Sequence, residues 1–360
     1  MKKILTLATL GLLSLAASPA FAQITVDGKL DAAEVGTGEG KYQLVGEYTG
    51  THSSADKGLK ALYVGSSATK LYIMTVASPE TTGYDALVLY LNVPDKAGVA
   101  AGTKLIGGAA GDSPLKHKPT FDMEVDYGIR ATTAPLADNN VYYSYTDYTN
   151  GNTAAVPDAY QGNSTKAGVA ITANAAAPSP LAGARLAYTS SATLSTNLTN
   201  TGVEIELDMA ALGLNAGERV DMVVGYTNGD GVYTSDLLPQ IAGQTTAIGA
   251  DPDFTAIDGK QSFAYVIGTG ILASRSAASK TLGFQVYPNP ARQTKVNYVV
   301  AGQKDVALEV FNLMGQRVRT LVAGKQSGSQ SVPLSELKAG TYLVKLRVGD
   351  QMTSQKVVIL

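Results

Sequence analysis

Short alternations of apolar and polar residues run through most of the chain and predict β-strands. The runs 59–64 and 71–76 flank residues 66–70, which predicts a hairpin with a five-residue loop. Residues 84–93 form a longer apolar run that is typical of a central strand buried on both faces. Few windows keep helical spacing for long, so we predict an all-β protein.

Two acidic strands and one short helical turn follow from the same pattern. Residues 121–127 alternate Phe, Met, Val and Tyr with Asp122, Glu124 and Asp126, which predicts a strand whose acidic face is solvated. Residues 203–208 repeat this pattern, and Asp208 and Gly213 then predict the cap and the stop of one helical turn. A hairpin is predicted around Asn228-Gly-Asp230.

Gly-, Ala-, Ser- and Thr-rich segments interrupt the strand pattern and divide the chain. Residues 94–120 and 150–195 are predicted to be surface loops that can carry binding. We predict a large β-sandwich over 23–270, a linker over 271–283, and a small immunoglobulin-like sandwich of about seven short strands over 284–360. The last sandwich opens on Phe284-Gln-Val-Tyr-Pro-Asn-Pro290, whose prolines are typical of an edge strand.

The first 22 residues have the pattern of a secretory signal peptide. Lys2 and Lys3 precede an apolar run from Ile4 to Ala17, and small residues two apart, Ala20 and Ala22, close the segment. We therefore exclude 1–22 from the fold and expect export. No later stretch reaches the ~20 apolar residues that a transmembrane helix needs.

Composition narrows the chemistry that is available. The chain has no cysteine, which excludes disulfides and thiolate catalysis. Residues 284–360 contain ten Lys/Arg and four Asp/Glu, which leaves sixteen Lys/Arg and twenty-six Asp/Glu for 23–283 once Lys2 and Lys3 are removed. Neither region has the clustered basic face typical of nucleic-acid binding, so we expect no nucleic-acid partner.

Four motifs near the end of the chain occur in a recognisable order. They are Tyr287-Pro-Asn-Pro290, VALEVFNLMGQRVRTL at 306–321, LKAGTYLVKL at 337–346 and KVVIL at 356–360. Together they resemble the type A C-terminal sorting domain of the type IX secretion system. The motif residues that this resemblance marks as the sorting signal are Pro288, Asn289, Pro290, Gly315, Gly340, Tyr342 and Lys356.

The resemblance implies a route and partners rather than an activity. Such domains are recognised by an outer-membrane translocon of Bacteroidota-type bacteria after Sec export to the periplasm. The cargo is then secreted or fixed to the outer cell surface, and the domain is commonly removed. From physics alone, the same residues also fit a small accessory sandwich with no sorting role.

The start of the mature chain resembles a second family. Ile24-Thr-Val-Asp-Gly-Lys-Leu-Asp-Ala-Ala-Glu34, the strand at 71–76 and the segment 203–213 resemble carbohydrate-binding family 9-like and DOMON-like β-sandwiches over about 24–240. The resemblance implies a sandwich that binds extracellular glycan. The chain departs from that pattern because it has no tryptophan, the usual sugar-stacking residue.

Tyrosines are the candidate replacement for tryptophan. The stretch 142–148 contains Tyr142, Tyr143, Tyr145 and Tyr148, which we take as candidate carbohydrate-binding residues. Alternation places Tyr143 and Tyr145 on one face of a strand and Tyr142 on the other, so half-buried sheet packing is the alternative interpretation.

Other chemistry finds less support. Asn228, Asp230 and Asp236 partly match a calcium loop, although Pro239 stands where the closing Glu belongs and a hairpin turn explains the same residues. A second set of possible metal ligands is Asp251, Asp253 and Asp258. We expect no organic cofactor and leave calcium as a possibility. The only histidines, His52 and His117, lie in loop-like stretches away from any nucleophile motif.

These observations predict a secreted or cell-surface protein without catalytic activity whose N-terminal sandwich binds glycan. Two alternatives remain open. One is an atypical surface glycoside hydrolase that uses paired carboxylates such as Asp122, Glu124 and Asp126, and the other is a purely structural or adhesive surface protein.

Overall fold

The chain folds as two compact units, as described by a computed structural model. The units are residues 1–270 and 271–360, here called the N-terminal and C-terminal units. The structure describes residues 24–108, 110–149, 158–271, 282–312, 317–335, 337–349 and 351–360. The predicted signal peptide, most of the predicted linker and Gly315 lie outside these residues.

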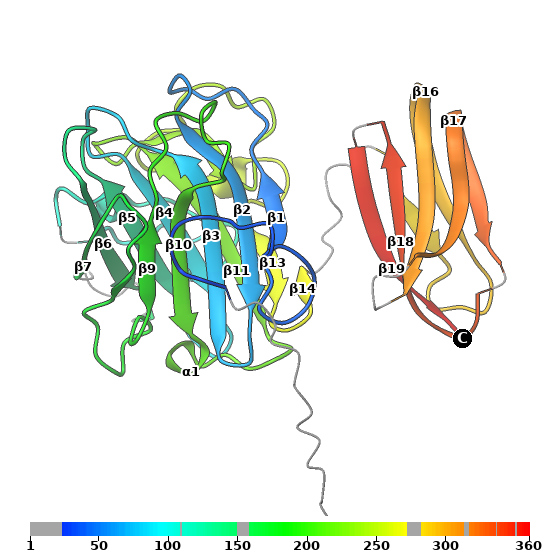
Figure 1. Cartoon of the computed structure of the whole chain (residues 1–360), viewed down its shortest axis with the longest axis horizontal. Coiled ribbons are helices and arrows are strands. Elements are labelled where there is room, and N and C mark those ends of the chain that lie inside the picture. The colour runs from blue at the N-terminus through cyan, green and yellow to red at the C-terminus, as the bar shows by residue number, and fades with distance from the viewer. Residues whose placement is uncertain are drawn as a thin grey trace, which may run out of the picture. The chain divides into compact units, whose positions relative to one another are not determined.

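The N-terminal unit contains two antiparallel sheets (Figure 1). The first sheet has the order β1-β2-β3-β10-β9-β8; its strands are Gln43–Glu47, Gly58–Ser66, Lys70–Ser78, Gly202–Asp208, Arg185–Tyr188 and Ile171–Thr172. The second sheet has the order β14-β13-β11-β4-β5-β6-β7, with β12 also paired to β11. Its strands are Gly270–Ile271, Phe263–Val266, Arg219–Thr227, Ala86–Asn92, Tyr127–Thr133, Asn140–Asp147, Ala159–Thr165 and, for β12, Tyr233–Leu238.

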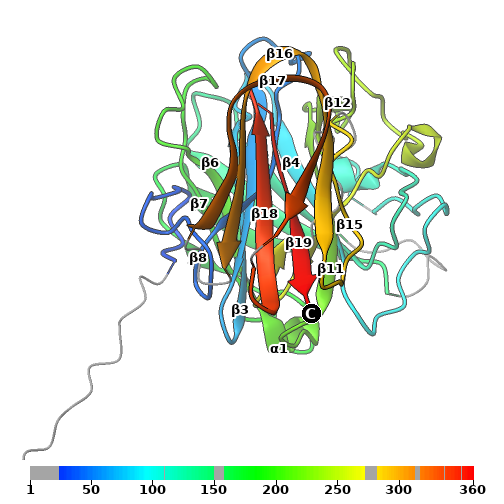
Figure 2. The ribbon, with the colours of Figure 1, turned by 90° about the vertical axis from the view of Figure 1, so that its right-hand side faces the viewer.

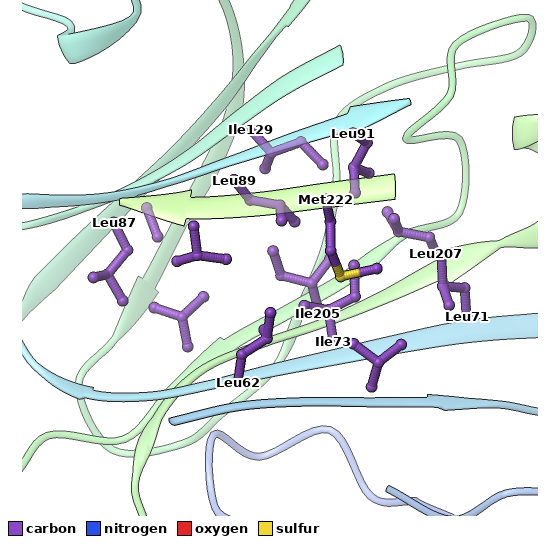
Figure 3. Packing of buried hydrophobic residues seen from close by; sticks show 14 of the residues in the cluster. Leu62, Leu71, Ile73, Leu87, Leu89, Leu91, Ile129, Ile205, Leu207 and Met222 are labelled. Atoms are coloured by element: carbon purple, nitrogen blue, oxygen red, sulfur yellow. The ribbon is translucent and has the colours of Figure 1, made fainter. Parts of the chain in front are cut away.

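The two sheets pack face to face over one large hydrophobic core. Leu71, Ile73 and Ile205 of the first sheet meet Leu89 and Met222 of the second, and all five side chains are buried (Figure 3). Burying apolar side chains of this size stabilises the fold by about 1.5–3 kcal/mol each. The all-β prediction is confirmed.

The outer face of the second sheet carries a second core, which the sequence did not predict. Tyr90 of β4 and Tyr233 of β12 pack with Leu115, Phe121 and Phe254 from the long connections between strands. Two short 3₁₀ helices, Pro114–Lys116 and Phe254–Ala256, supply part of this layer. The segment 94–120 is therefore packed against the sheet through its apolar residues, where we expected a surface loop.

The outer face of the first sheet is covered by the N-terminal segment 24–42, here called the strap. Ile24, Leu30 and Tyr42 of the strap pack on Tyr72 and Met74 of β3 in a separate core. Because this cover and the second core flank the sandwich, both sheets have a buried outer face over part of their area.

Local predictions succeed where the sequence carries a direct signal. The hairpin β2–β3 forms, with residues 67–69 as its loop rather than five residues. Helix α1, Met209–Leu212, follows β10, with the Asp208 carboxylate accepting from the N–H groups of Ala210 and Ala211. Gly213 ends it in the left-handed region, with φ of +75°.

The C-terminal unit is one bent sheet wrapped around a single core. Its strands are β15 Gln285–Tyr287, β16 Thr294–Asn312, β17 Arg317–Leu334, β18 Gly340–Val348 and β19 Gln351–Ile359. The order is β15-β16-β18-β19, and β17 pairs along β16 (Figures 1 and 2). We predicted about seven short strands; β16 and β17 are each long enough to replace two of them.

The bend lies where the pairing of β16 with β17 shifts between Val300 and Lys304. Before it, β16 pairs with β15, and after it, β16 pairs with β18. Val296 from the first half and Leu308 from the second belong to the same buried core. The two halves of the sheet therefore face one another as two layers. In the described residues of either unit, no helix has the length and hydropathy of a membrane span.

Candidate functional site

The structure separates the four predicted sugar-binding tyrosines. Tyr143 is completely buried between the sheets and its hydroxyl bonds the Ser164 Oγ at 2.9 Å. Tyr148 is also completely buried, in the second core. The Tyr145 hydroxyl accepts from the Ser179 Oγ at 3.0 Å, and its ring packs on the core between the sheets. Tyr142 is the one member of the four that lies on the outer face without being covered by the second core. The four residues therefore do not form one surface, and Tyr143 and Tyr148 present no ring to an external ligand.

Tyr142 has two tyrosine neighbours on that outer face that the sequence did not single out. Tyr84 precedes β4 and is 51% exposed, and Tyr160 of β7 is 52% exposed. Partial desolvation, Asp138 and these two tyrosines together raise the pKa of Tyr142, in agreement with their proximity. We call Tyr84, Tyr142 and Tyr160 the tyrosine row.

A chain of polar side chains runs beside the tyrosine row. The Tyr160 hydroxyl donates to the Asn163 Oδ1 at 3.1 Å, and the Asn163 Nδ2 donates to the Asn140 Oδ1 at 3.0 Å. The Asn140 Nδ2 donates to the Asp138 Oδ1 at 2.6 Å. Asn163 lies directly opposite Tyr142 in the pairing of β6 with β7, so both side chains are on the same face.

An ion pair lies on the same face, and its Arg130 is level with Tyr160 across the sheet because both lie opposite Ser144. Arg130 of β5 donates from its Nε to Asp158 at 3.3 Å and from its Nη1 to the Thr132 hydroxyl at 2.7 Å. The Asp158 side chain is 1% exposed and that of Arg130 12%. Since each charge is compensated by the other, this face presents no free charge from the pair.

The predicted calcium loop is held together as a turn. The Asn228 Oδ1 accepts from the N–H groups of Asp230 and Val232 at 3.0 and 2.9 Å. Asp236 lies in β12, completely buried, and accepts from the Leu59 N–H at 2.9 Å and bonds the His52 Nδ1 at 2.7 Å. The Asp236 carboxylate is thus bound to His52 and Leu59 and does not join Asn228 and Asp230 in a calcium loop. Across the described ranges, no group of three or more His, Asp or Glu side chains is placed to share a metal ion.

The predicted acidic strand at 121–127 is wrong as a strand, because only Tyr127 begins one. Its carboxylates bind loop backbone instead of facing solvent: Asp122 accepts from the Gln261 N–H at 2.6 Å, Glu124 from Gly98 at 2.9 Å and Asp126 from Val93 at 2.7 Å. Asp126 is completely buried, and burial raises its pKa to about 6.

The motif at residues 24–34 contacts a buried carboxylate. Glu204 of β10 accepts from the N–H groups of Asp27 and Gly28 and from the Tyr42 hydroxyl, each at 2.7 Å. Burial raises the pKa of Glu204 to about 7. Gly28 has φ of +72°, and a Cβ there would lie 2.4 Å from the Thr189 nitrogen, so the turn requires glycine. Glu204 therefore fastens the strap to the first sheet.

Four of the predicted sorting residues, Pro288, Asn289, Pro290 and Lys356, lie at one edge of the C-terminal unit. The Asn289 Nδ2 donates to the Lys356 carbonyl at 2.8 Å, and its Oδ1 accepts from the Val358 N–H at 2.9 Å. Ala291 continues the contact, because its N–H donates to the Val358 carbonyl at 3.1 Å and its carbonyl accepts from the Leu360 N–H at 3.2 Å. Pro288, Asn289, Pro290 and Lys356 are all exposed.

The other two described sorting residues lie at the start of β18. Gly340 begins the strand, and the Tyr342 hydroxyl donates to the Lys338 carbonyl at 2.9 Å. This contact closes the turn that precedes β18.

Comparison with known proteins identifies the C-terminal unit. Residues 285–360 match the family of the secretion system C-terminal sorting domain. The sequence-based prediction of a type IX sorting domain is therefore confirmed, and the chain is cargo of that system, exported to the cell surface or the extracellular space.

The N-terminal unit has no comparable assignment. Among solved structures, a chain described as "Biofilm associated protein - BSP domain" is similar at 11% identity with a TM-score of 0.16, over 86% of this chain and 50% of that one. This chain thus spans half the length of that structure. No curated protein matches. The family 9-like and DOMON-like resemblance is not confirmed.

Proposed function

We propose that this chain is a non-catalytic surface protein whose N-terminal unit binds extracellular carbohydrate through the tyrosine row. The sorting domain supplies the route, and the predicted signal peptide would supply the Sec step before it. The observation that carries the binding proposal is the position of exposed tyrosine rings beside a hydrogen-bonded line of amide side chains, on an open sheet face.

The chemistry of this face suits a sugar. The C–H faces of a sugar ring pack on aromatic rings, which bring large contact area and a polar hydroxyl. Asn140 and Asn163 carry both donors and acceptors, as sugar hydroxyls do. The tyrosine row and the neighbouring amides therefore offer a sugar both an aromatic surface for stacking and side chains that donate and accept hydrogen bonds.

The contacts of the acidic side chains at 122–126 support a non-catalytic N-terminal unit. Hydrolysis of a glycosidic bond needs two carboxyl groups that flank the bond. Asp122, Glu124 and Asp126, the carboxylates that we considered for this role, each accept a backbone N–H in the second layer. Their contacts are those of groups that hold loops in place.

Carbohydrate binding is tested with the purified full chain on a panel of polysaccharides. We expect binding to at least one, and Tyr142→Ala should lower the affinity about tenfold, the equivalent of 1.4 kcal/mol. Tyr63→Ala, a half-buried tyrosine on the first sheet, serves as the control and should bind as the wild type. Binding to no polysaccharide contradicts the proposal and favours a structural or adhesive role. Release of sugar products contradicts the non-catalytic part.

A further inference from the structure

We infer, on the basis of the proposed function, that the tyrosine row takes an extended segment of a neutral polysaccharide, several linked sugars long, rather than a single terminal sugar. The inference comes from the register of four neighbouring strands, from the charge of the face and from where that face is open.

The strand register arranges the three tyrosines in a diagonal line. Thr132 of β5 lies opposite both Ala86 of β4 and Tyr142 of β6, so these positions are level across the sheet. Tyr84 stands two residues before Ala86. Tyr160 lies opposite Ser144, two residues after Tyr142. Since β4 and β6 run in the same direction, Tyr84 and Tyr160 are displaced to opposite sides of Tyr142.

The length of this line exceeds one sugar. From β4 to β7 there are three strand spacings of ~4.8 Å, and four residues of ~3.3 Å separate the two ends along the strands, which gives roughly 20 Å from Tyr84 to Tyr160. One sugar ring is about the size of one tyrosine ring and covers one member of the row. Only a chain of linked sugars contacts all three.

The polar groups beside the row favour an uncharged chain. Arg130 is compensated by Asp158, and the Asp138 carboxylate accepts from Asn140. Asn163 and the tyrosine hydroxyls are neutral hydrogen-bonding groups. An acidic polysaccharide would bring carboxylates to this face without an uncompensated cation to bind them.

The face is open along the diagonal and closed below it. A Cβ on Gly128 of β5 would lie 3.1 to 3.2 Å from Tyr90, Leu115 and Tyr148, so the second core covers the sheet at that level. Tyr84, Tyr160 and Asn163 are exposed, and β7 is the edge of the sheet. Among the described residues, both end tyrosines of the diagonal are therefore accessible, so a polymer that lies along the row can extend past Tyr84 at one end and past Tyr160 at the other.

The test measures affinity against ligand length, with the full chain. Glucose and β-1,4-linked glucose oligomers of two to six units are used first, followed by the same series from any neutral polysaccharide that binds in the panel. We expect affinity to rise at least tenfold between one unit and the length that spans the row, and then to level off. Tyr84→Ala and Tyr160→Ala should each weaken the longest oligomer severalfold and leave the two-unit oligomer nearly unchanged. Tyr142→Ala should weaken both, and Tyr63→Ala neither.

Each outcome distinguishes this inference from the proposed function. Equal affinity for all lengths overturns the extended-segment inference and leaves carbohydrate binding intact. Loss of binding when the reducing end of the oligomer is chemically reduced has the same meaning, because it shows that the terminal sugar is what the protein recognises. Binding of oligogalacturonate as tight as that of the neutral oligomers overturns the neutral class. Absence of binding to every oligomer and every polysaccharide overturns both.

Discussion

Replacement of Asn289 by alanine is expected to reduce export of the chain severalfold, although Asn289 is an exposed residue near the start of the sorting domain. Its side chain acts as a short piece of strand, donating to Lys356 and accepting from Val358. Two such bonds contribute about 0.5–1.5 kcal/mol each. Without these bonds the end of β19, which carries Lys356, separates more often from the segment 288–290. The sorting machinery then encounters the two motifs less often in their native arrangement. The protein inside and outside the cells, quantified by immunoblotting, gives the result.

Two variants separate positioning from plain loss of stability. Asn289→Asp keeps the acceptor for Val358 but loses the donor to Lys356, so its export should fall between wild type and Asn289→Ala. Val344→Ala weakens the buried core of β18 without touching the contact, and it should be exported better than Asn289→Ala at a similar melting temperature. Equal export of the two at matched stability would show that Asn289 acts only through the stability of the domain. Hydrogen exchange of the Val358 amide reports the local opening directly.

Replacement of Glu204 by glutamine is expected to remove a large part of the pH dependence of stability of the N-terminal unit. Burial raises the pKa of Glu204 from 4.5 to about 7, so the native state binds this proton more tightly than the unfolded state. The stabilisation is therefore complete below about pH 4.5 and is lost as the pH rises through 7, by on the order of 3 kcal/mol. Glutamine carries no charge, its oxygen accepts from Asp27 and Gly28, and its amide donates to the Tyr42 oxygen.

Urea unfolding at pH 5 and pH 8 measures this effect. The chain has no tryptophan, so far-ultraviolet circular dichroism is a suitable signal. The difference in unfolding free energy between Glu204→Gln and wild type should shift in favour of the variant by on the order of 3 kcal/mol from pH 5 to pH 8. Glu47→Gln, an exposed carboxyl on β1, should leave the profile unchanged. A pH-independent difference would mean that Glu204 is ionised throughout this range.

The parts of the fold that the sequence predicts correctly are those set by residues close together in the chain, without contacts from distant segments. The end of β10 shows this, because Asp208 caps helix α1 and Gly213 stops it through local geometry. The sorting motifs behave in the same way, since their order along the chain identified the domain. The alternation at 121–127 failed because apolar and acidic residues alternate equally well in a loop whose apolar residues enter a core and whose carboxylates bind backbone amides.

The candidate site was only partly predictable for a similar reason. Alternation placed Tyr142 correctly on the opposite face from Tyr143. Tyr160 was missed because it lies in a segment rich in Ala, Asn, Ser and Thr, and because a shift in the pairing of β6 with β7 between Tyr143 and Ser144 hides the strand period. The approach of Tyr160 and of Tyr84 to Tyr142 depends on how the strands β4 to β7 pair with one another, which no local pattern reports.

Deletion of residues 284–360 tests the division of the chain into an exported passenger and its sorting domain most directly. The shortened chain, expressed in the cells that export the full protein, should accumulate in the periplasm with its N-terminal unit folded and should be absent from the cell surface and the medium. Appearance of the shortened chain outside the cells in wild-type amounts would contradict this division of roles.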